Sequence, residues 1–231
     1  MGPRGTPSRS TIKALGGPSG LVRWKPALRP HARRSTISPV TVGGPRGDSL
    51  HLSWVRCVKR LSSQQCADII TIGRSFPTEP PTVVGGGMLL AHRVGAVHLL
   101  ADVPETQAIY RLLWDVAADA AERHYGLAIS AISRMPHFVE YEAGRGHFHW
   151  HNDYSHESAE SPRKLTVVIQ LSDPGDYEGG DLEVFDVNAT ALPREQGTIL
   201  CLPSFVAHRV TPVTAGMRRV VVAWIAGPRL R

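Results

Sequence analysis

The chain has 231 residues, a length at which one domain with a sizeable core is expected. The formal net charge is +6, but residues 1–47 hold nine of the 26 basic residues and no acidic one, which leaves 17 basic against 20 acidic residues, or −3, in the remainder. A hydrophobic fraction of 42%, no apolar run of 18 residues and only three cysteines argue against a membrane span and a disulfide scaffold, and the location of the charge argues against a nucleic-acid-binding surface on the folded part.

Residues 1–47 are rich in Gly, Pro, Ser and Arg and show no apolar periodicity. Such a segment cannot bury enough surface to offset its ordering entropy, so we expect a disordered basic tail. An Arg-rich, Ser-rich and acid-free segment is also typical of organellar targeting, and a mis-assigned upstream start is a further alternative. We expect a cytoplasmic location, with organellar targeting by this segment as the alternative.

Residues 48–126 are predicted to form a helical support region. A short strand is expected at 52–58. Ser62-Ser-Gln-Gln65 has the form of a capping box and predicts the start of a helix. Residues 76–100 are mixed, and Pro80-Pro81 and Gly85-Gly-Gly87 mark loops within them.

A second, longer helix is predicted at 103–124. Apolar residues recur there at helical spacing, and Asp102 or Glu105 is expected to cap the first turn. Tyr125-Gly126 then ends the helix, because glycine readily adopts the left-handed conformation of a helix terminus.

From residue 127 the apolar pattern changes to a period of two. Segments 165–171, 180–185, 197–202 and 218–225 are predicted strands, and Gly- and Pro-containing turns separate them. Helices followed by a run of short strands indicate an α+β fold. We expect residues 127–231 to form a double-stranded β-helix (jelly roll, cupin-like) core, with the N-terminal helices packed on one sheet.

The densest polar stretch of the chain, residues 141–153, ends with a pair of metal-binding residue types. His151 and Asp153 are two apart, so on an extended strand both point to the same face. His208, 55 residues after Asp153 in another predicted strand, is the candidate third ligand. Two histidines and one carboxylate leave coordination positions open, which suits iron(II) better than a closed structural zinc site.

Two alternatives to this ligand set come from the same stretch. Alone, His-x-Asp is a weak motif, and in a chain with 11 histidines it also arises as a surface feature. His147 and His149 alternate onto the predicted face of His151, so a His-x-His metal pair of the cupin kind is a further possibility.

Three ordered segments around these residues carry a resemblance. They are Tyr141-x-x-Gly144 before His151-x-Asp153; Lys164-Leu-Thr-Val-Val-Ile-Gln-Leu171 followed by Gly179-Gly-Asp-Leu182; and Pro203-Ser-Phe-Val-Ala-His208 continuing to Arg218 and Trp224. From Tyr141 to Trp224 the sequence resembles the prolyl 4-hydroxylase-like 2-oxoglutarate dioxygenases, most closely the PKHD-type hydroxylases. The resemblance is strong over the last 100 residues or so and only general before them.

The resemblance implies a role for each matching residue. His151, Asp153 and His208 would ligate iron(II), and Arg218 would pair with the distal carboxylate of 2-oxoglutarate. Its neighbour Arg219 would point to the other face of the strand. Three further residues are implied at the co-substrate: Tyr141, as a hydroxyl donor, and Thr166 and Gln170, on the strand face that lines the cavity.

The implied reaction is hydroxylation of an unactivated C–H bond, with 2-oxoglutarate and O2 as co-substrates, succinate and CO2 as products, and ascorbate as a possible reductant. A prolyl or other amino-acid-type substrate is expected, as a small molecule or within a peptide, and no nucleic acid or membrane partner. A nucleic-acid demethylase typically has a second arginine six residues after the co-substrate arginine, where this chain has Trp224. A non-catalytic jelly-roll binding module and a zinc or nickel cupin are the alternatives from other classes; the sequence does not specify the oligomeric state.

Overall fold

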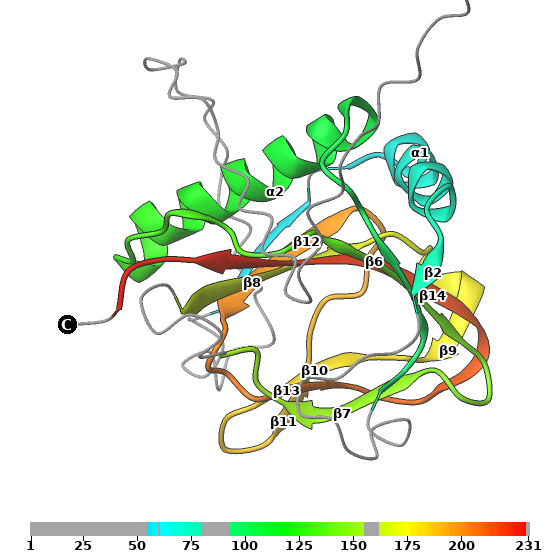
Figure 1. Ribbon diagram of the computed structural model, residues 1–231. Helices are drawn as coiled ribbons and strands as arrows, with labels where there is room; N and C mark the ends of the chain where they lie inside the picture. Colours follow the sequence, from blue (N-terminus) through cyan, green and yellow to red (C-terminus); the bar gives the residue numbers. More distant parts are fainter. Residues whose placement is uncertain (1–54, 60, 80–92, 155–161, 230–231) are drawn as a thin grey trace, which may run out of the picture.

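A computed structural model describes residues 55–59, 61–79, 93–154 and 162–229 of the chain. Within these ranges two antiparallel sheets face one another, and helices cover the outer face of the larger sheet (Figure 1). The predicted tail at 1–47 and the predicted loops at 80–81 and 85–87 lie outside the described residues.

The larger sheet contains nine strands among the described residues. Seven follow the order β1-β12-β8-β14-β6-β4-β2, and β5 and β9 both pair with β14. Their bounds are β1 Arg56–Lys59, β2 Thr78–Glu79, β4 Ala96–Leu99, β5 Ala131–Ile132, β6 His137–Glu142, β8 Arg163–Gln170, β9 Tyr177–Gly179, β12 Thr198–Pro203 and β14 Val213–Ala226.

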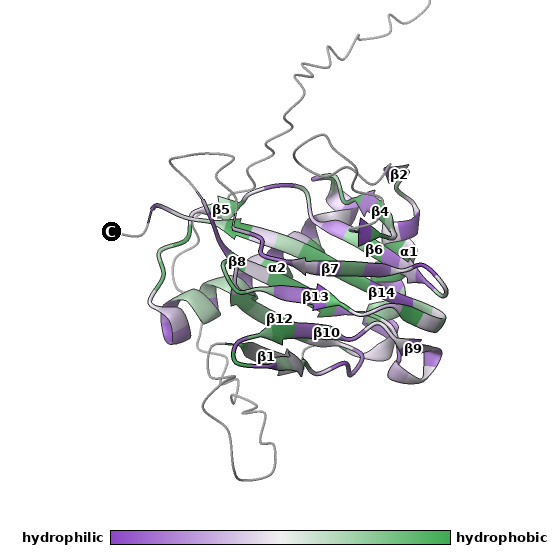
Figure 2. Ribbon diagram, turned by 90° about the horizontal axis from the view of Figure 1, so that it is seen from below, coloured by the Kyte–Doolittle hydropathy of each residue, from purple (hydrophilic) through white to green (hydrophobic). Residues whose placement is uncertain are grey.

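The smaller sheet has the order β11-β10-β13-β7-β3. Its strands are β3 Arg93–Val94, β7 His147–His151, β10 Leu182–Phe185, β11 Ala189–Ala191 and β13 His208–Val210. Figure 2, which views the molecule from the side of this sheet, shows β7, β13 and β10 side by side in front of the larger sheet. The space between the two sheets is where a jelly roll can hold a ligand.

The first helix, α1 (Ser63–Arg74), begins as the capping box predicts. The Ser62 hydroxyl accepts from the Gln65 backbone N–H at 3.3 Å, and the Ser62 N–H donates to the Gln65 side chain at 2.9 Å. Cys66 and Ile69 face the core from this helix, which packs beside β4 and β6.

The second predicted helix consists of three consecutive segments. A 3-10 turn (Pro104–Thr106), α2 (Gln107–Ala120) and a π-helical turn (Ala121–Tyr125) follow one another, and Gly126 ends the run with a left-handed φ of 59°. The expected carboxylate cap is not formed. Asp102 instead accepts from the Gln107 side chain, and the Thr106 hydroxyl accepts from the Val103 N–H at 3.2 Å.

The fold class is the predicted one, but the predicted boundary at residue 126 does not separate two structural units. β1 pairs with β12, β3 with β7 and β4 with β6, so the region before residue 127 adds strands to both sheets as well as two helices. The helices pack against the larger sheet, where α2 contacts β8, β12 and β14. None of the helices in the described ranges is long and apolar enough to cross a membrane.

Candidate active site

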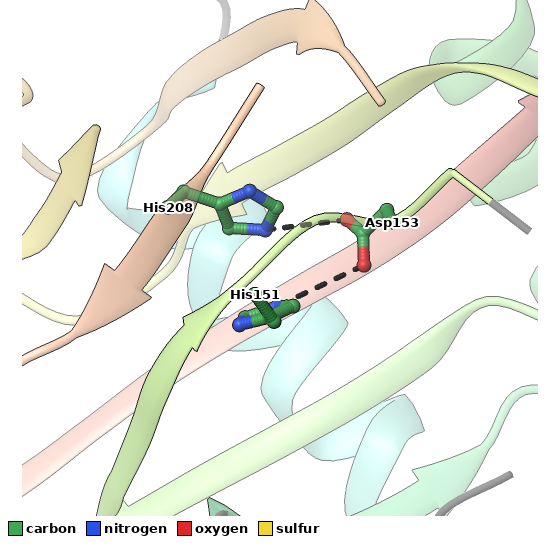
Figure 3. Close-up of side chains that lie close together, drawn as sticks. All are labelled: His151, Asp153 and His208. Atoms are coloured by element: carbon green, nitrogen blue, oxygen red, sulfur yellow. Dashed lines mark ion pairs between the residues drawn. The ribbon is translucent and has the colours of Figure 1, made fainter. Parts of the chain in front are cut away.

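The three predicted metal ligands lie together at the end of the smaller sheet. His151 is the last residue of β7, and it pairs directly with His208, the first residue of β13. Asp153 follows two residues after β7, where its N–H donates to the Ser204 carbonyl at 2.8 Å. Figure 3 shows the carboxylate of Asp153 between the two imidazole rings.

The distances within this group suit one metal ion. Asp153 Oδ1 is 3.7 Å from His151 Nε2, and Asp153 Oδ2 is 3.3 Å from His208 Nε2. One ligand atom from each residue lies within 4.8 Å of the other two. A shared coordination position is therefore within reach of all three side chains.

Backbone carbonyls fix the orientation of both imidazoles. Nδ1 of His151 is 2.7 Å from the His149 carbonyl, and Nδ1 of His208 is 2.9 Å from the Val206 carbonyl. A carbonyl only accepts, so each Nδ1 carries the proton. Nε2 of each ring is thus left as the metal-binding nitrogen.

The electrostatics of the group keep Asp153 ionised. Burial alone would raise its pKa, but the hydrogen bond and charge of His208, followed by His151 and Thr166, outweigh burial and lower it. Burial, together with the nearby charge of His208, lowers the pKa of His151 to about 4. Burial opposes protonation of His208 as well, yet Asp153 holds the pKa of His208 above its ordinary value. A metal ion at this position would replace the proton on His208 and neutralise the carboxylate.

This donor set fits iron(II). Two neutral imidazole nitrogens and one carboxylate would hold such an ion, and all three residues line the pocket between the sheets. A structural zinc ion would need a fourth protein ligand, and among the described residues no other histidine, cysteine or acidic residue joins the group.

Thr166 of β8 contacts the predicted metal ligand Asp153 rather than the arginine. Its hydroxyl donates to Asp153 Oδ2 at 2.7 Å and lies 3.1 Å from the Ser204 hydroxyl. Thr166 faces the cavity, as predicted from its strand position, but its contact is with the carboxylate that would hold the metal. It can orient Asp153, which is a different role from the co-substrate contact that the resemblance implies.

Arg218 of β14 lies in the same pocket and is only 1% exposed. Its Nη2 donates to Gln170 Oε1 at 3.0 Å, while Nε and Nη1 have no hydrogen-bond partner among the described residues. Burial lowers its pKa, and Tyr141, Tyr177 and Asp181 oppose that shift, so the guanidinium keeps its charge. A buried cation with two unused donors is suited to a ligand carboxylate.

The surroundings of Arg218 match the predicted co-substrate set in part. Tyr141 is buried in the pocket with its ring centre 5.5 Å from the guanidinium carbon. Gln170 contributes to the pocket only indirectly, by accepting a hydrogen bond from the pocket-lining Arg218. Gly180, with a φ of 65°, lies so close that an added Cβ would stand 3.1 Å from Arg218 Cδ. The glycine thus leaves room for the arginine side chain.

The pocket runs from Arg218 at one end to the metal ligands and Trp224 at the other. Val168, Val220 and Val222 line it between the two polar ends. A small dicarboxylate bound to Arg218 would lie along this wall toward the metal.

The predicted alternation places His147 and His149 together, with ring centroids 4.8 Å apart, but the prediction that His151 shares their face is wrong. β7 and β13 pair His151 with His208 and Phe148 with Val210, so three residue steps on β7 oppose two on β13. This bulge turns Phe148, not His149, into the pocket, where its ring stacks on His151 with centroids 3.5 Å apart. The side chain of His149 is exposed, and the alternative His-x-His metal pair is not formed.

Several residues of this site carried no recognised sequence signal. Ser204 holds the Asp153 backbone and contacts Thr166, and Tyr177 acts on Arg218 from a separate strand. Strand alternation does not predict that Phe148 faces the pocket, because the bulge between β7 and β13 changes the face that it occupies. A serine shortly before a strand, as Ser204 is, or an aromatic residue before two glycines, as Tyr177 is, occurs too often in sequences to indicate a role in a site. Only the fold shows these contacts.

Comparison with known proteins supports one family. Residues 136–226 match the model of the 2OG-Fe(II) oxygenase superfamily. A PKHD-type hydroxylase of Prochlorococcus marinus is 44% identical over 62 residues, which cover 26% of this chain and 28% of the relative. Another from Paraburkholderia xenovorans is 32% identical over 133 residues, 53% of this chain and 57% of the relative. In these alignments the chain spans less than two thirds of the length of its curated relatives.

Solved structures agree on the fold. A prolyl-4-hydroxylase of Pseudomonas putida superposes with a TM-score of 0.61 and 15% identity, covering 77% of this chain and 94% of the other. At this identity the similarity concerns the fold alone. The jelly-roll arrangement of the two sheets is therefore shared with that protein.

Proposed function

Because residues 136–226 match the model of the 2OG-Fe(II) oxygenase superfamily and are similar to PKHD-type hydroxylases, we propose that the protein is an iron(II)- and 2-oxoglutarate-dependent hydroxylase. One observation carries the proposal. The His151, Asp153 and His208 group and the buried Arg218 guanidinium line the same pocket, from opposite ends. That pocket offers a metal position and a carboxylate position in a single cavity, as a 2-oxo dicarboxylate requires.

At the metal end of the pocket, neighbouring groups hold the three proposed ligand side chains in one orientation. The His149 and Val206 carbonyls keep the imidazole Nε2 atoms directed to the ion, and Thr166 holds one oxygen of Asp153. Fixed ligands of this kind lose little freedom on binding, which favours affinity and a reproducible arrangement of the open positions.

The carboxylate end is built to hold an anion. Gln170 fixes the Arg218 guanidinium from one side, and Nε and Nη1 of this pocket-lining arginine have no hydrogen-bond partner among the described residues. Tyr141 lines the same pocket, and we propose that it donates its hydroxyl to the same ligand. The valine-lined wall between the ends excludes water from the ligand carbon chain.

When bound, iron(II) supplies the site at which O2 converts 2-oxoglutarate to succinate and CO2 and hydroxylates a C–H bond of the substrate. We propose a prolyl or other amino-acid-type substrate, free or within a peptide, with ascorbate sustaining the iron(II) state. No disulfide joins the buried thiols of Cys66 and Cys201, which suits a reducing compartment, and we propose that the activity is cytoplasmic.

The test is succinate formation by anaerobically purified protein supplied with iron(II), 2-oxoglutarate and then O2. We expect succinate only when all three are present, and stimulation by a substrate found in a mass-spectrometric screen for products 16 Da heavier. Arg123→Gln, an exposed change on the turn after α2, is the control and should behave as the natural protein. Equal succinate formation with iron removed by a chelator would contradict the proposal.

A further inference from the structure

Three buried side-chain nitrogens without a hydrogen-bond partner among the described residues gather at the metal end of the pocket, away from Arg218. They are Arg93 Nε of β3, His137 Nδ1 of β6 and Trp224 Nε1 of β14. Trp224 is only 6% exposed, and Arg93 and Trp224 both line the pocket. Trp224 pairs with Thr166 and lies six residues along the strand from Arg218, roughly 20 Å away at the usual rise per residue.

Positively charged guanidinium groups surround these three nitrogens. The Arg163 guanidinium lies over the Trp224 ring at 4.3 Å, and the Arg93 guanidinium lies over the Phe148 ring at 5.1 Å. Burial, then Arg93, Arg163 and Arg134, lower the pKa of His137 to about 3, so His137 is neutral at pH 7. A guanidinium stacked on a ring keeps its edge N–H groups free to bind an oxyanion in its plane.

The proposed metal site and co-substrate leave the positive charge of Arg93 without a counter-charge. Iron(II) and Arg218 together carry +3, and Asp153 and the 2-oxoglutarate dianion together carry −3. The charge of Arg93 is left over, and no described residue forms an ion pair with it. A partly desolvated cation without a counter-charge is costly, which calls for one more anion at this end of the pocket.

We propose that the primary substrate carries a carboxylate and that Arg93 and the indole N–H of Trp224 bind it. The inference rests on the proposed function and adds the substrate class: an acidic, amino-acid-type compound held by its carboxylate with a C–H bond toward the metal. The carboxylate can belong to a free amino acid or to an acidic side chain of a peptide. Both are planar oxyanions that match one guanidinium edge.

The test is anaerobic calorimetry on protein loaded with iron(II) and 2-oxoglutarate. The ligands are N-acetyl-L-proline, its neutral amide, an acetylated and amidated proline–glutamate dipeptide, and inorganic phosphate. We expect the acid to bind at least about tenfold more tightly than the amide. Tight binding of the dipeptide would assign the carboxylate to a peptide side chain, and tight binding of N-acetylproline alone would assign it to a free amino acid. Binding of phosphate in preference to every carboxylate would overturn the proposal.

Variants locate the site. Arg93→Gln should reduce the acid-over-amide preference to less than about threefold, Arg93→Lys should retain part of it, and Trp224→Phe, which removes the indole N–H but keeps an aromatic ring, should weaken it. Arg123→Gln is the charge-matched control and should keep the full preference. A melting curve for each variant checks that it folds.

Two results would overturn the inference without touching the proposed function. One is equal binding of acid and amide by a protein that still makes succinate from 2-oxoglutarate. The other is a tenfold or larger loss of 2-oxoglutarate affinity in Arg93→Gln, which would assign these donors to the co-substrate. Conversely, carboxylate-selective binding by a protein that makes no iron-dependent succinate would overturn the proposed function alone.

Discussion

The guanidinium groups of Arg218 and Arg219 lie on opposite faces of β14, although the two residues are adjacent in the chain. Arg218 is buried in the pocket and bonded to Gln170 at 3.0 Å. Arg219 lies on the other face and donates from Nε to Glu140 at 2.9 Å. The strand alternation therefore gives one arginine to the pocket and the other to an ion-pair network behind it.

Arg218→Ala should raise the 2-oxoglutarate requirement by roughly a hundredfold or more. Truncating one partner of a buried charge pair costs several kcal/mol, and each 1.4 kcal/mol is about tenfold in affinity. Arg218→Lys should recover only part of the loss, because one ammonium cannot reproduce two parallel N–H donors. Titration of 2-oxoglutarate with succinate as the readout measures both effects.

Arg219→Ala is the matched control for that experiment. It should change the 2-oxoglutarate requirement by less than about threefold, since its side chain does not reach the pocket. A larger effect of Arg219→Ala than of Arg218→Ala would mean that the pocket residues of β14 are wrongly assigned.

His208→Ala should abolish iron binding and succinate formation while the protein stays folded. The ring is one of the three proposed ligands, and the β core rather than the metal supplies most of the apolar burial. His149→Ala is the control and should keep stoichiometric iron, measured by metal analysis beside a thermal melt. Loss of iron in His149→Ala would mean that His149 is a metal ligand, as in the alternative His-x-His pair.

Much of this site follows from short-range spacing. His151 and Asp153 are two residues apart, and Arg218 shares the parity of Val220, Val222 and Trp224, so strand alternation alone places each group on a face. The capping box at Ser62 likewise needs only four residues to form. Such features depend on local geometry, which the sequence determines directly.

Other parts depend on pairing between distant segments. The bulge that turns Phe148 inward exists because β7 and β13 meet with unequal spacing, and nothing within residues 147–151 encodes that. Arg93 and Trp224 share a pocket although 131 positions separate them. The strands β1 to β4 are two to four residues long, too short for a periodic pattern to reveal that they extend both sheets.

Thr166→Val should weaken iron binding by about tenfold or more. Valine fills nearly the same volume but cannot donate to Asp153 Oδ2, and loss of a hydrogen bond to a metal ligand typically costs 10–100-fold. Ser204→Ala is the comparison. Its hydroxyl touches Thr166 and not the carboxylate, so we expect a smaller loss. Equal iron affinities of Thr166→Val and the natural protein, from competition with a chelator, would show that the hydroxyl does not support the ligand.

Glu140 of β6 connects the helix α1 to the back of the larger sheet. Its Oε1 accepts from Arg219 at 2.9 Å and from Arg74 at 2.8 Å, and its side chain is mostly buried. Burial alone would raise its pKa, but the two arginines outweigh burial and hold the pKa of Glu140 below its ordinary value of 4.5. A depressed folded-state pKa stabilises the fold above the unfolded-state value, and this contribution is lost as the pH falls through the folded-state pKa.

Glu140→Gln should therefore lower the free energy of unfolding at pH 7 by about 1–3 kcal/mol, because both arginines lose their charged acceptor. The difference from the natural protein should shrink as the pH falls below the ordinary glutamate value of 4.5 toward the lower folded-state pKa of Glu140, because the carboxyl group of the natural protein then becomes protonated in its turn. Urea unfolding at pH 7 and at pH 3 measures the two differences. Glu142→Gln, an exposed carboxylate paired with Arg145, is the control and should cost no more than about 0.5 kcal/mol at either pH. A Glu140→Gln difference that grows toward pH 3 would mean that Glu140 is protonated in the folded protein at neutral pH.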